Sequence, residues 1–255
     1  MDSKLKFQII SDIHFESLDR SISTRDMINN NISDILIIVG DIGRLENFER
    51  YKEIVMSFCN DFKQVYLIPG NHEYYSDTVP IETLETYITR LDADIHNLKI
   101  LNDEYIDLPG NFRIYGTTLW SRLTTKESAN KQLSIKSNKD ECIGNKFWMN
   151  KMFFICLHNI NTVIHKSKKD GKTLIIASHY APRYEECLDK KFHRCPYRFW
   201  YATNLGFLMK RENIHTWIYG HTHVNNDTIL YNGTRLVSNQ YKGYGYDRDK
   251  LIEIE

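Results

Sequence analysis

The chain has 255 residues, of which 42% are hydrophobic and 13% aromatic, and its formal net charge at pH 7 is zero. This length fits one large domain with a sizeable core, so we expect a single domain over residues 1–255. The balanced charge excludes a global field that recruits nucleic acid or a membrane, so attraction to a polyanion must come from a local patch.

Short apolar runs rich in β-branched residues recur along the chain and predict buried strands. They are Phe7–Ile10, Ile35–Val39, Val65–Ile68, Leu174–Ala177 and Trp217–Tyr219. Apolar residues at helical spacing predict helices over Arg44–Asn60 and from Pro80 to Leu91, the second with proline at its start. Strands that alternate with helices indicate βαβ units in an α/β fold, with helices layered against a sheet.

The later part of the chain predicts further strands and a long helix. We expect strands at Lys99–Asn102 and Phe112–Leu119, and a helix over Asp140–Lys166. Its apolar face is expected to contain Ile143, Phe147, Phe154, Leu157 and Ile164. Asn232-Gly233 between Thr228–Tyr231 and Thr234–Ser238 is a strong hairpin signal. The terminal antiparallel strands therefore predict a mixed sheet or a two-sheet core.

The cysteines and the absence of long apolar segments bear on where the protein works. Five cysteines without a Cys-x-x-Cys pair indicate reduced thiols rather than a disulfide framework or a zinc knuckle. The N-terminal residues lack the apolar stretch of a signal peptide, and no apolar segment approaches the ~20 residues that span a bilayer. We therefore expect a soluble, cytoplasmic protein that does not associate with a membrane.

Polar clusters stand where the predicted strands end, which is the edge at which open α/β sheets bind ligands. Each cluster is a weak signal alone, but together they offer seven oxygen and imidazole ligands. Residues i and i+2 of a strand point the same way, so each D-x-H or H-x-H pair is expected to address a common point. Seven ligands exceed the needs of one tetrahedral zinc and suit two cations about 3.5–4 Å apart. The clusters are Asp12-Ile13-His14, Gly40-Asp41, Gly70-Asn71-His72-Glu73, Ser178-His179 and Gly220-His221-Thr222-His223.

The order of these clusters from Phe7 to His223 resembles the calcineurin-like metallophosphoesterase superfamily. The resemblance implies a four-layered α/β/β/α sandwich with mixed sheets. It also implies that Asp41 bridges two divalent metals, and that the other six ligands divide between them. Asp12, His14 and His223 would bind the first metal, and Asn71, His179 and His221 the second. The mixed nitrogen and oxygen set suits manganese, iron or zinc, with manganese favoured, better than magnesium or calcium.

The same resemblance gives His72 a separate part in the chemistry. It implies in-line attack on phosphorus by a hydroxide that bridges the metals, with His72 as general acid for the leaving group. Glu73 has two open interpretations: it orients a ligand imidazole, or it is a solvated loop residue.

One segment departs from the phosphoprotein Ser/Thr phosphatase branch of that superfamily. Ile42-Gly43-Arg44 follows Gly40-Asp41, where that branch has Asp-Arg-Gly. This difference argues against a protein phosphatase of that type. It also leaves unidentified the group that orients His72. Four other segments resemble a branch of small microbial phosphoesterases: Gly116–Trp120, Ser178–Pro182, Tyr201–Leu205 and Gly233–Asn239.

The substrate is expected to be a small phosphodiester or a nucleotide. The basic and aromatic segment from Arg183 to Trp200 follows the His179 strand end and is expected to overhang the metals. Four arginines are candidate substrate contacts: Arg122, Arg183, Arg194 and Arg198. The alternative is that this segment is a solvated basic loop, and the acidic residues within it favour that interpretation.

Two other functions stay open at this point. A nuclease acting on single-stranded nucleic acid would use the same segment to bind the strand. A non-catalytic scaffold that binds a protein partner would keep the fold without needing both metals. The intact ligand set and His72 favour the enzyme.

Overall fold

The computed structural model describes residues 4–19, 21–124, 132–139, 141–209 and 214–255. Its first sheet has the strand order β14-β1-β2-β3-β5. The central strands are parallel, and β14 pairs antiparallel with β1 at the edge. The strands are β1 (Leu5–Ile10), β2 (Ile35–Val39), β3 (Gln64–Ile68), β5 (Leu98–Ile100) and β14 (Leu251–Ile254).

A second sheet has the strand order β12-β13-β11-β10-β7-β6 and is also mixed. Its strands are β12 (Asp227–Ile229), β13 (Arg235–Val237), β11 (Ile214–Tyr219), β10 (Thr173–Ser178), β7 (Phe112–Thr117) and β6 (Glu104–Leu108). A small third sheet joins β4 (Ser76–Pro80), β8 (Leu133–Lys136) and β9 (Cys142–Gly144). The helices are α1 (Thr24–Met27), α2 (Phe48–Asp61), α3 (Ile81–Asp94), α4 (Lys146–Lys169) and α5 (Gly206–Met209).

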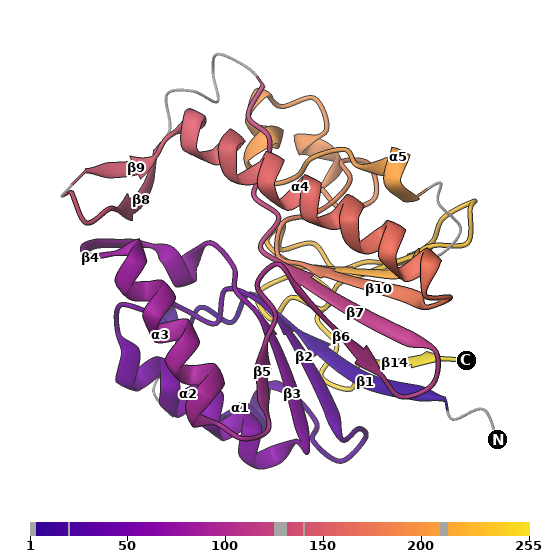
Figure 1. The fold of residues 1–255 in the computed structure, drawn as a ribbon. Helices are drawn as coiled ribbons and strands as arrows, with labels where there is room; N and C mark the ends of the chain where they lie inside the picture. The colour runs from indigo at the N-terminus through magenta and orange to yellow at the C-terminus, as the bar shows by residue number, and fades with distance from the viewer. Residues whose placement is uncertain (1–3, 20, 125–131, 140, 210–213) are drawn as a thin grey trace.

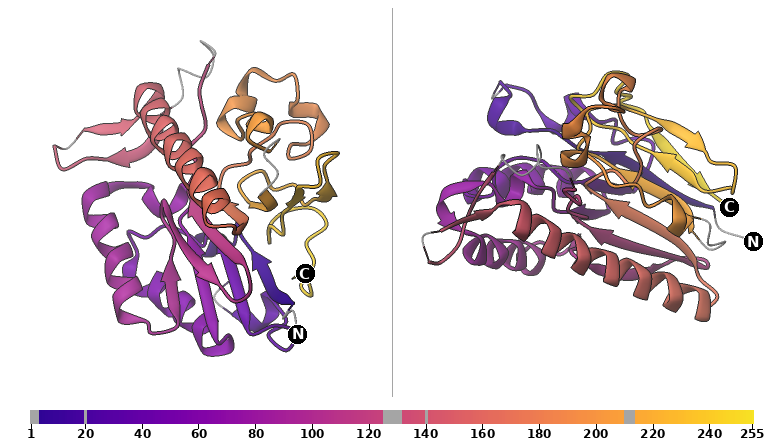
Figure 2. Two further views of the ribbon diagram at one scale, coloured as in Figure 1. Left: turned by 45° about the vertical axis from the view of Figure 1, so that its right-hand side comes forward. Right: turned by 90° about the horizontal axis from the view of Figure 1, so that it is seen from above.

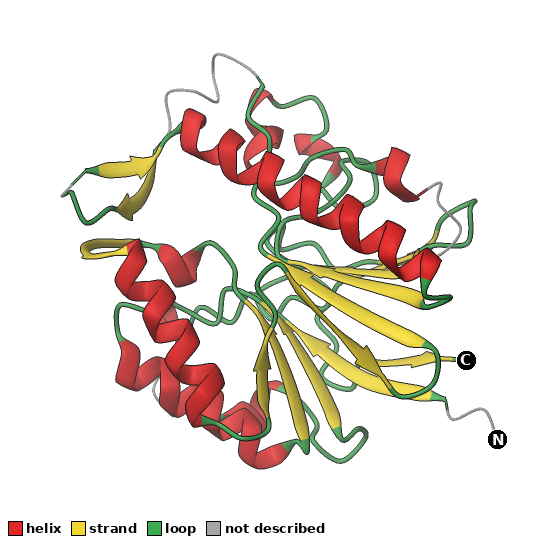
Figure 3. Ribbon diagram, in the orientation of Figure 1, coloured by secondary structure: helices red, strands yellow, loops and turns green. Residues whose placement is uncertain are grey.

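The two large sheets pack face to face, with helices on their outer sides (Figures 1 and 3). Apolar side chains from both sheets form the layer between them, among them Phe7, Ile37, Ile175 and Ile218. Outside this layer α2 and α3 cover the first sheet and α4 covers the second, as the two further views also show (Figure 2). The continuous apolar runs are explained by strands that are covered on both faces. The predicted four-layered α/β/β/α sandwich is therefore confirmed.

Several predicted elements are confirmed with shifted ends. The predicted helix from Arg44 begins later, at Phe48, and the helix after Pro80 runs to Asp94 with Pro80 as its N-cap residue. The hairpin around Asn232-Gly233 is the antiparallel pair β12–β13. The strands β6 and β14 and the small third sheet were not predicted from the sequence, because these strands of three to five residues are too short to give a clear local pattern.

The prediction for the long helix was wrong in its start and in two residues of its buried face. Asp140, where the helix was expected to begin, lies outside the described residues, and β9 precedes the helix, which starts at Lys146. Phe147 and Phe154 are 82% and 52% exposed. Ile164 is buried as expected, and Leu157 is partly buried against the core. The other buried residues of the helix are Met149, Phe153, Cys156, Ile160, Val163 and Ser167. Hydrophobicity alone does not place an aromatic side chain in the core, since Phe153 is buried whereas the neighbouring Phe154 is exposed.

Among the described residues, no helix combines the length and the apolar character that crossing a membrane requires.

Candidate metal centre and active site

Turns that follow β1 and β2 carry the first candidate ligands of the site. Asp12, His14 and Asp41 have positive φ angles of 55°, 49° and 53° and lie beyond the last strand residues. Backbone hydrogen bonds join the two turns, from Asp12 N to Gly40 O at 3.0 Å and from His14 N to Asp41 O at 3.0 Å. The expectation that strand alternation aligns Asp12 with His14 was wrong in its reason, because left-handed turns aim these side chains. Such strained conformations cluster at functional sites.

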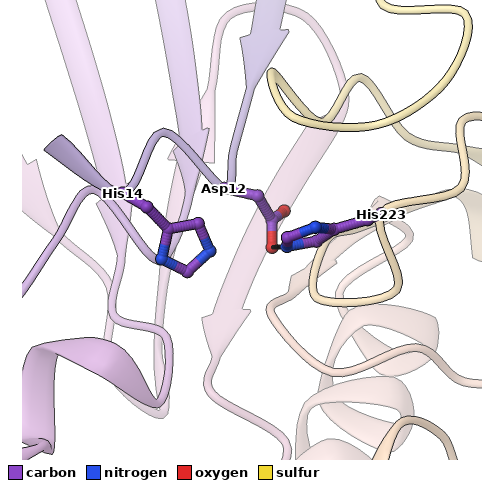
Figure 4. A group of neighbouring side chains, drawn as sticks. All are labelled: Asp12, His14 and His223. Atoms are coloured by element: carbon purple, nitrogen blue, oxygen red, sulfur yellow. Dashed lines mark ion pairs between the residues drawn. The ribbon is translucent and has the colours of Figure 1, made fainter. Parts of the chain in front are cut away.

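Asp12, His14 and His223 form one group in which potential ligand atoms all lie within 4.8 Å of one another. Asp12 lies between the two imidazoles, and its Oδ1 is 3.5 Å from His223 Nε2 (Figure 4). Two backbone N–H groups of the loop after β11 hold the group in place. The His221 N–H donates to Asp12 Oδ1 at 2.9 Å, and the His223 N–H donates to Gln240 Oε1 at 2.6 Å.

Asp41, His179 and His221 form a second group with the same spacing. His179 Nε2 lies 3.2 Å from Asp41 Oδ2 and 3.0 Å from Asn71 Oδ1. The other nitrogen of each histidine is held by a backbone carbonyl: His179 Nδ1 by Val39 at 2.8 Å, and His221 Nε2 by Trp200 at 3.0 Å. These carbonyls accept N–H bonds and so leave His179 Nε2 and His221 Nδ1 as the basic nitrogens.

Asp41 connects the two groups. Its Oδ2 lies 3.2 Å from His179 Nε2 and 3.7 Å from His14 Nε2, while its Oδ1 accepts the His72 N–H at 2.8 Å. The loops approach so closely that a Cβ at Gly70 would lie 2.3 Å from Asp41 Oδ1. Glycine at this position therefore allows β3 to deliver its loop against that carboxylate.

The charges in the site fit divalent cations. Burial opposes ionisation of Asp41, yet His179 outweighs it and lowers the pKa of Asp41. Burial likewise opposes a charge on His179, but Asp41 raises the pKa of His179 to about 9. Burial and the charge of His179 lower the pKa of His221 to about 3. Within the described part of the chain, the buried His14 Nε2 has no hydrogen-bond partner. Two buried carboxylates and a buried free imidazole nitrogen are a donor set that suits metal binding.

Glu73 fits neither interpretation offered from the sequence. Its side chain is buried, with the residue 1% exposed, so it is not a solvated loop residue. Its oxygens accept hydrogen bonds from the backbone N–H groups of Asp41, Ile42 and Gly70 and from the Tyr51 hydroxyl. It does not orient an imidazole directly, and instead fastens the second and third strand-end loops together.

His72 lies beside both groups, and its surroundings include a residue that the sequence reading missed. Glu16 Oε1 is 3.1 Å from His72 Nδ1, and the Tyr75 ring is 4.7 Å from the His72 ring between centroids. Burial opposes a charge on His72, but the bond to Glu16 outweighs it and raises the pKa of His72. Glu16 also lines a cavity of about 800 Å³ between the segment after β1 and the helix α2. Its position two residues after His14 was the available sequence signal.

The contacts of the predicted substrate arginines are with residues outside this centre. The Arg183 side chain pairs with Glu186, and the Arg198 side chain donates to the His193 carbonyl and lies over the Phe199 ring. Arg122 is exposed, with its guanidinium 5.5 Å from the Phe154 ring centroid, and Arg194 is exposed as well. The segment that carries three of them reaches the site through Trp200, whose carbonyl meets His221.

Two packed mixed sheets with Asp, Asn and His side chains gathered at their strand ends define the metallophosphoesterase class. The chain belongs to the calcineurin-like phosphoesterase family, whose family model matches residues 5–225. The family makes it a phosphoester hydrolase that depends on metal.

Relatives and solved structures agree with this assignment. A protein of Acanthamoeba polyphaga mimivirus, "Uncharacterized protein L509", is 28% identical over 95% of this chain and 92% of its own length. A metallophosphoesterase of Helicobacter pylori is 30% identical over 43% of this chain and 29% of its own length. Phosphopantetheinyl hydrolase from Mycobacterium tuberculosis has a similar fold, with TM-score 0.65, 16% identity and coverage of 100% of this chain and 97% of that one. A dimetal phosphatase from Danio rerio gives TM-score 0.57 and 15% identity over 91% of this chain and 86% of that one.

Proposed function

We propose that this protein is a dinuclear metal-dependent phosphoesterase that hydrolyses a small phosphodiester or a nucleotide-type ester. The observation that carries the proposal is the position of Asp41. One carboxylate oxygen, Oδ2, faces His14 of one ligand group and His179 of the other. A carboxylate so placed has enough lone pairs to serve both groups at once, as a dinuclear site requires.

The seven ligands divide into two overlapping sets. Asp12, His14, Asp41 and His223 would hold one cation, and Asp41, Asn71, His179 and His221 the other. Two such cations, with manganese favoured over iron and zinc, would lower the pKa of water towards ~7 and neutralise phosphoryl charge. The protein contributes fixed imidazole orientations, because carbonyl groups hold the outer nitrogens of His179 and His221.

His72 supplies the proton that the leaving group needs. In hydrolysis the oxygen of water forms a new bond to phosphorus and one ester P–O bond breaks. The electron pair of that bond goes to the leaving oxygen, which takes a proton from His72 Nε2, and a proton from the attacking water restores the balance. The His72 backbone N–H is fixed on Asp41 Oδ1, so the acid and the ligand set keep a constant relation.

The contacts of two of the four predicted arginines support a small substrate. A nucleic-acid strand needs a row of free cationic groups along its backbone. Arg183 and Arg198 are engaged within their own segment. Arg44 stands where the phosphoprotein branch has a different sequence, and it lies 3.5 Å from Glu46. These contacts favour a compact phosphodiester or nucleotide over a long polyanion or a phosphoprotein.

A direct test is hydrolysis of bis(p-nitrophenyl) phosphate by protein loaded with Mn²⁺. We expect turnover by the wild type and a loss of roughly 10²-fold or more in kcat for Asp41→Asn and for His72→Ala. His158→Ala is the matched control, since His158 is exposed on α4. Full activity in Asp41→Asn would contradict the bridging assignment, and an inactive but metal-loaded wild type would favour a scaffold.

A panel of substrates separates the remaining alternatives. Phosphomonoesters, cyclic nucleotides, dinucleotides and single-stranded nucleic acid are compared at two salt concentrations. We expect a small ester to be preferred with little salt dependence. A preference for single strands with affinity that falls steeply with salt would establish the nuclease instead.

A further inference from the structure

Glu16 connects the two imidazoles that flank Asp41. Its Oε1 lies 3.3 Å from His14 Nδ1 and 3.1 Å from His72 Nδ1, and the two rings meet edge to face with centroids 4.3 Å apart. We propose that Glu16 is the positioning residue for His72 in the phosphoester hydrolysis proposed above, on which this inference rests. It acts through His72 and does not itself touch the reacting atoms.

The chemistry of the contact fixes which nitrogen of each ring faces inward. An ionised carboxylate only accepts hydrogen bonds, so an imidazole bound to it through Nδ1 carries its proton there. When His72 is doubly protonated, its Nε2–H is then the proton available to the leaving group, and the neutral ring that remains keeps its proton on Nδ1. His14 is left with the buried Nε2 that faces Asp41. One carboxylate therefore sets the same tautomer in a metal-ligand candidate and in the acid.

The surrounding backbone keeps Glu16 in this position. Glu16 lies in the 3₁₀ helix Phe15–Ser17, which the Phe15 N–H ties to the Ile42 carbonyl at 2.9 Å. The next residue along that strand-end loop is Gly43. A Cβ at Gly43 would lie 2.7 Å from Glu16 Oε2 and 2.3 Å from Phe15 Cε1. Glycine at position 43 thus leaves room for the Glu16 carboxylate to pack against the loop that carries Asp41.

Two other contacts hold His72 in place, but only Glu16 determines which ring nitrogen carries the proton. The His72 backbone N–H is bound by Asp41 Oδ1, and the Tyr75 ring packs against the His72 imidazole. Neither contact distinguishes Nδ1 from Nε2. The Glu16 bond does, and it supplies the orienting group that the sequence left unidentified.

The consequence for catalysis is a dependence on the leaving group. An alcohol of low pKa, such as 4-nitrophenol, departs with little proton transfer, whereas phenol needs more help from an acid. The substrates are the methyl 4-nitrophenyl and methyl phenyl phosphodiesters, with saturating Mn²⁺. We expect Glu16→Ala to lower kcat for the phenyl ester by a factor about 10-fold or more greater than for the nitrophenyl ester. Glu16→Gln should retain part of the activity, because its amide oxygen still accepts from Nδ1. Adding Glu16→Ala to His72→Ala should cost little more than His72→Ala alone.

Glu53→Ala is the matched control, because Glu53 lines the same cavity on α2 and its side chain is 66% exposed. It should leave the ratio of the two rates unchanged. An equal loss on both esters in Glu16→Ala, or additive losses in the double variant, would overturn the proposal.

A second readout does not depend on turnover. Long-range ¹⁵N–¹H spectra of the metal-free protein, recorded above the pKa of His72, report which imidazole nitrogen carries the proton. The His72 signals are assigned by their loss in His72→Ala. We expect Nδ1–H in the wild type and in Glu53→Ala, and a mixed or Nε2–H form in Glu16→Ala. Unchanged His72 signals in Glu16→Ala would overturn the proposal. If the wild type hydrolyses neither ester, the proposed function fails, and these spectra still decide the Glu16 contact.

Discussion

At the scale of single residues, Glu73 shows how one buried carboxylate organises the strand-end loops. It accepts three backbone N–H bonds and one from Tyr51. Glu73→Gln keeps the size but replaces an accepting oxygen by an NH₂ group that faces other donors. We expect the free energy of unfolding to fall by about 2–4 kcal/mol, since buried donors lose a charged acceptor.

Urea unfolding of the metal-free protein measures this effect without interference from ligands. Glu53→Gln is the control and should change stability by less than about 0.5 kcal/mol, because that side chain is 66% exposed. Equal midpoints for Glu73→Gln and the wild type would show that the loops do not depend on this carboxylate.

The residues of the candidate site differ in how far the sequence could reveal them. Asp41, His72 and the histidines stand in short motifs after strong apolar runs, so their gathering was predictable. Gln240 binds the His223 N–H from 17 positions along the chain, in a loop without a local pattern. Glu73 lies in a recognised motif, yet three of its four hydrogen-bond donors are backbone groups, which leave no trace in residue types.

At the scale of elements, Arg113 joins three of them. This residue on β7 is 3% exposed, and its guanidinium binds Asp107 on β6 at 2.6 Å and Asp170 after α4 at 2.9 Å. Hydrogen bonds from Arg113 lower the pKa of both carboxyls, against a smaller opposing effect of burial. Their contribution to stability is therefore present above the unfolded pKa of ~4 and is lost as the pH falls through the folded value.

We expect Arg113→Met to lower the free energy of unfolding at pH 7, and the difference from the wild type to shrink as the pH falls below ~4. Urea midpoints of the two proteins between pH 7 and pH 3 measure it. Lys63→Met removes a pair whose side chains are 79% and 66% exposed, and it should show almost no difference at any pH. A difference for Arg113→Met that stays constant with pH would mean that packing, and not the ion pairs, accounts for the loss.

The elements also show where sequence patterns stop being informative. Strands β2, β3 and β10 are buried on both faces and read as unbroken apolar runs, which made them plain. Strand β6 has the sequence Glu-Tyr-Ile-Asp-Leu, in which two of the five residues are charged, and it lies at a sheet edge. Strands β14 and β1 pair although they lie at opposite ends of the sequence. Edge strands take their pairing from tertiary structure, which local propensity does not contain.

At the scale of the whole molecule, the candidate ligands come from both large sheets. Asp12, Asp41 and Asn71 follow strands of the first sheet, and His179 and His221 follow strands of the second. Cations held by these groups would tie the two sheets together at one edge. Binding to the folded state alone stabilises it by about 4 kcal/mol at 1,000 times the Kd.

For a chain of this size that corresponds to a rise of roughly 10 °C in Tm. We therefore expect excess Mn²⁺ to raise the Tm of metal-free protein by that order and a chelator to reverse it, as measured by differential scanning fluorimetry. Asp41→Asn should abolish most of the shift, because it weakens the carboxylate that both ligand groups share. The Glu53→Gln control should keep the shift intact. A Tm that responds to neither metal nor chelator would mean that the two sheets do not hold a cation between their strand ends, and the dinuclear proposal would fall with it.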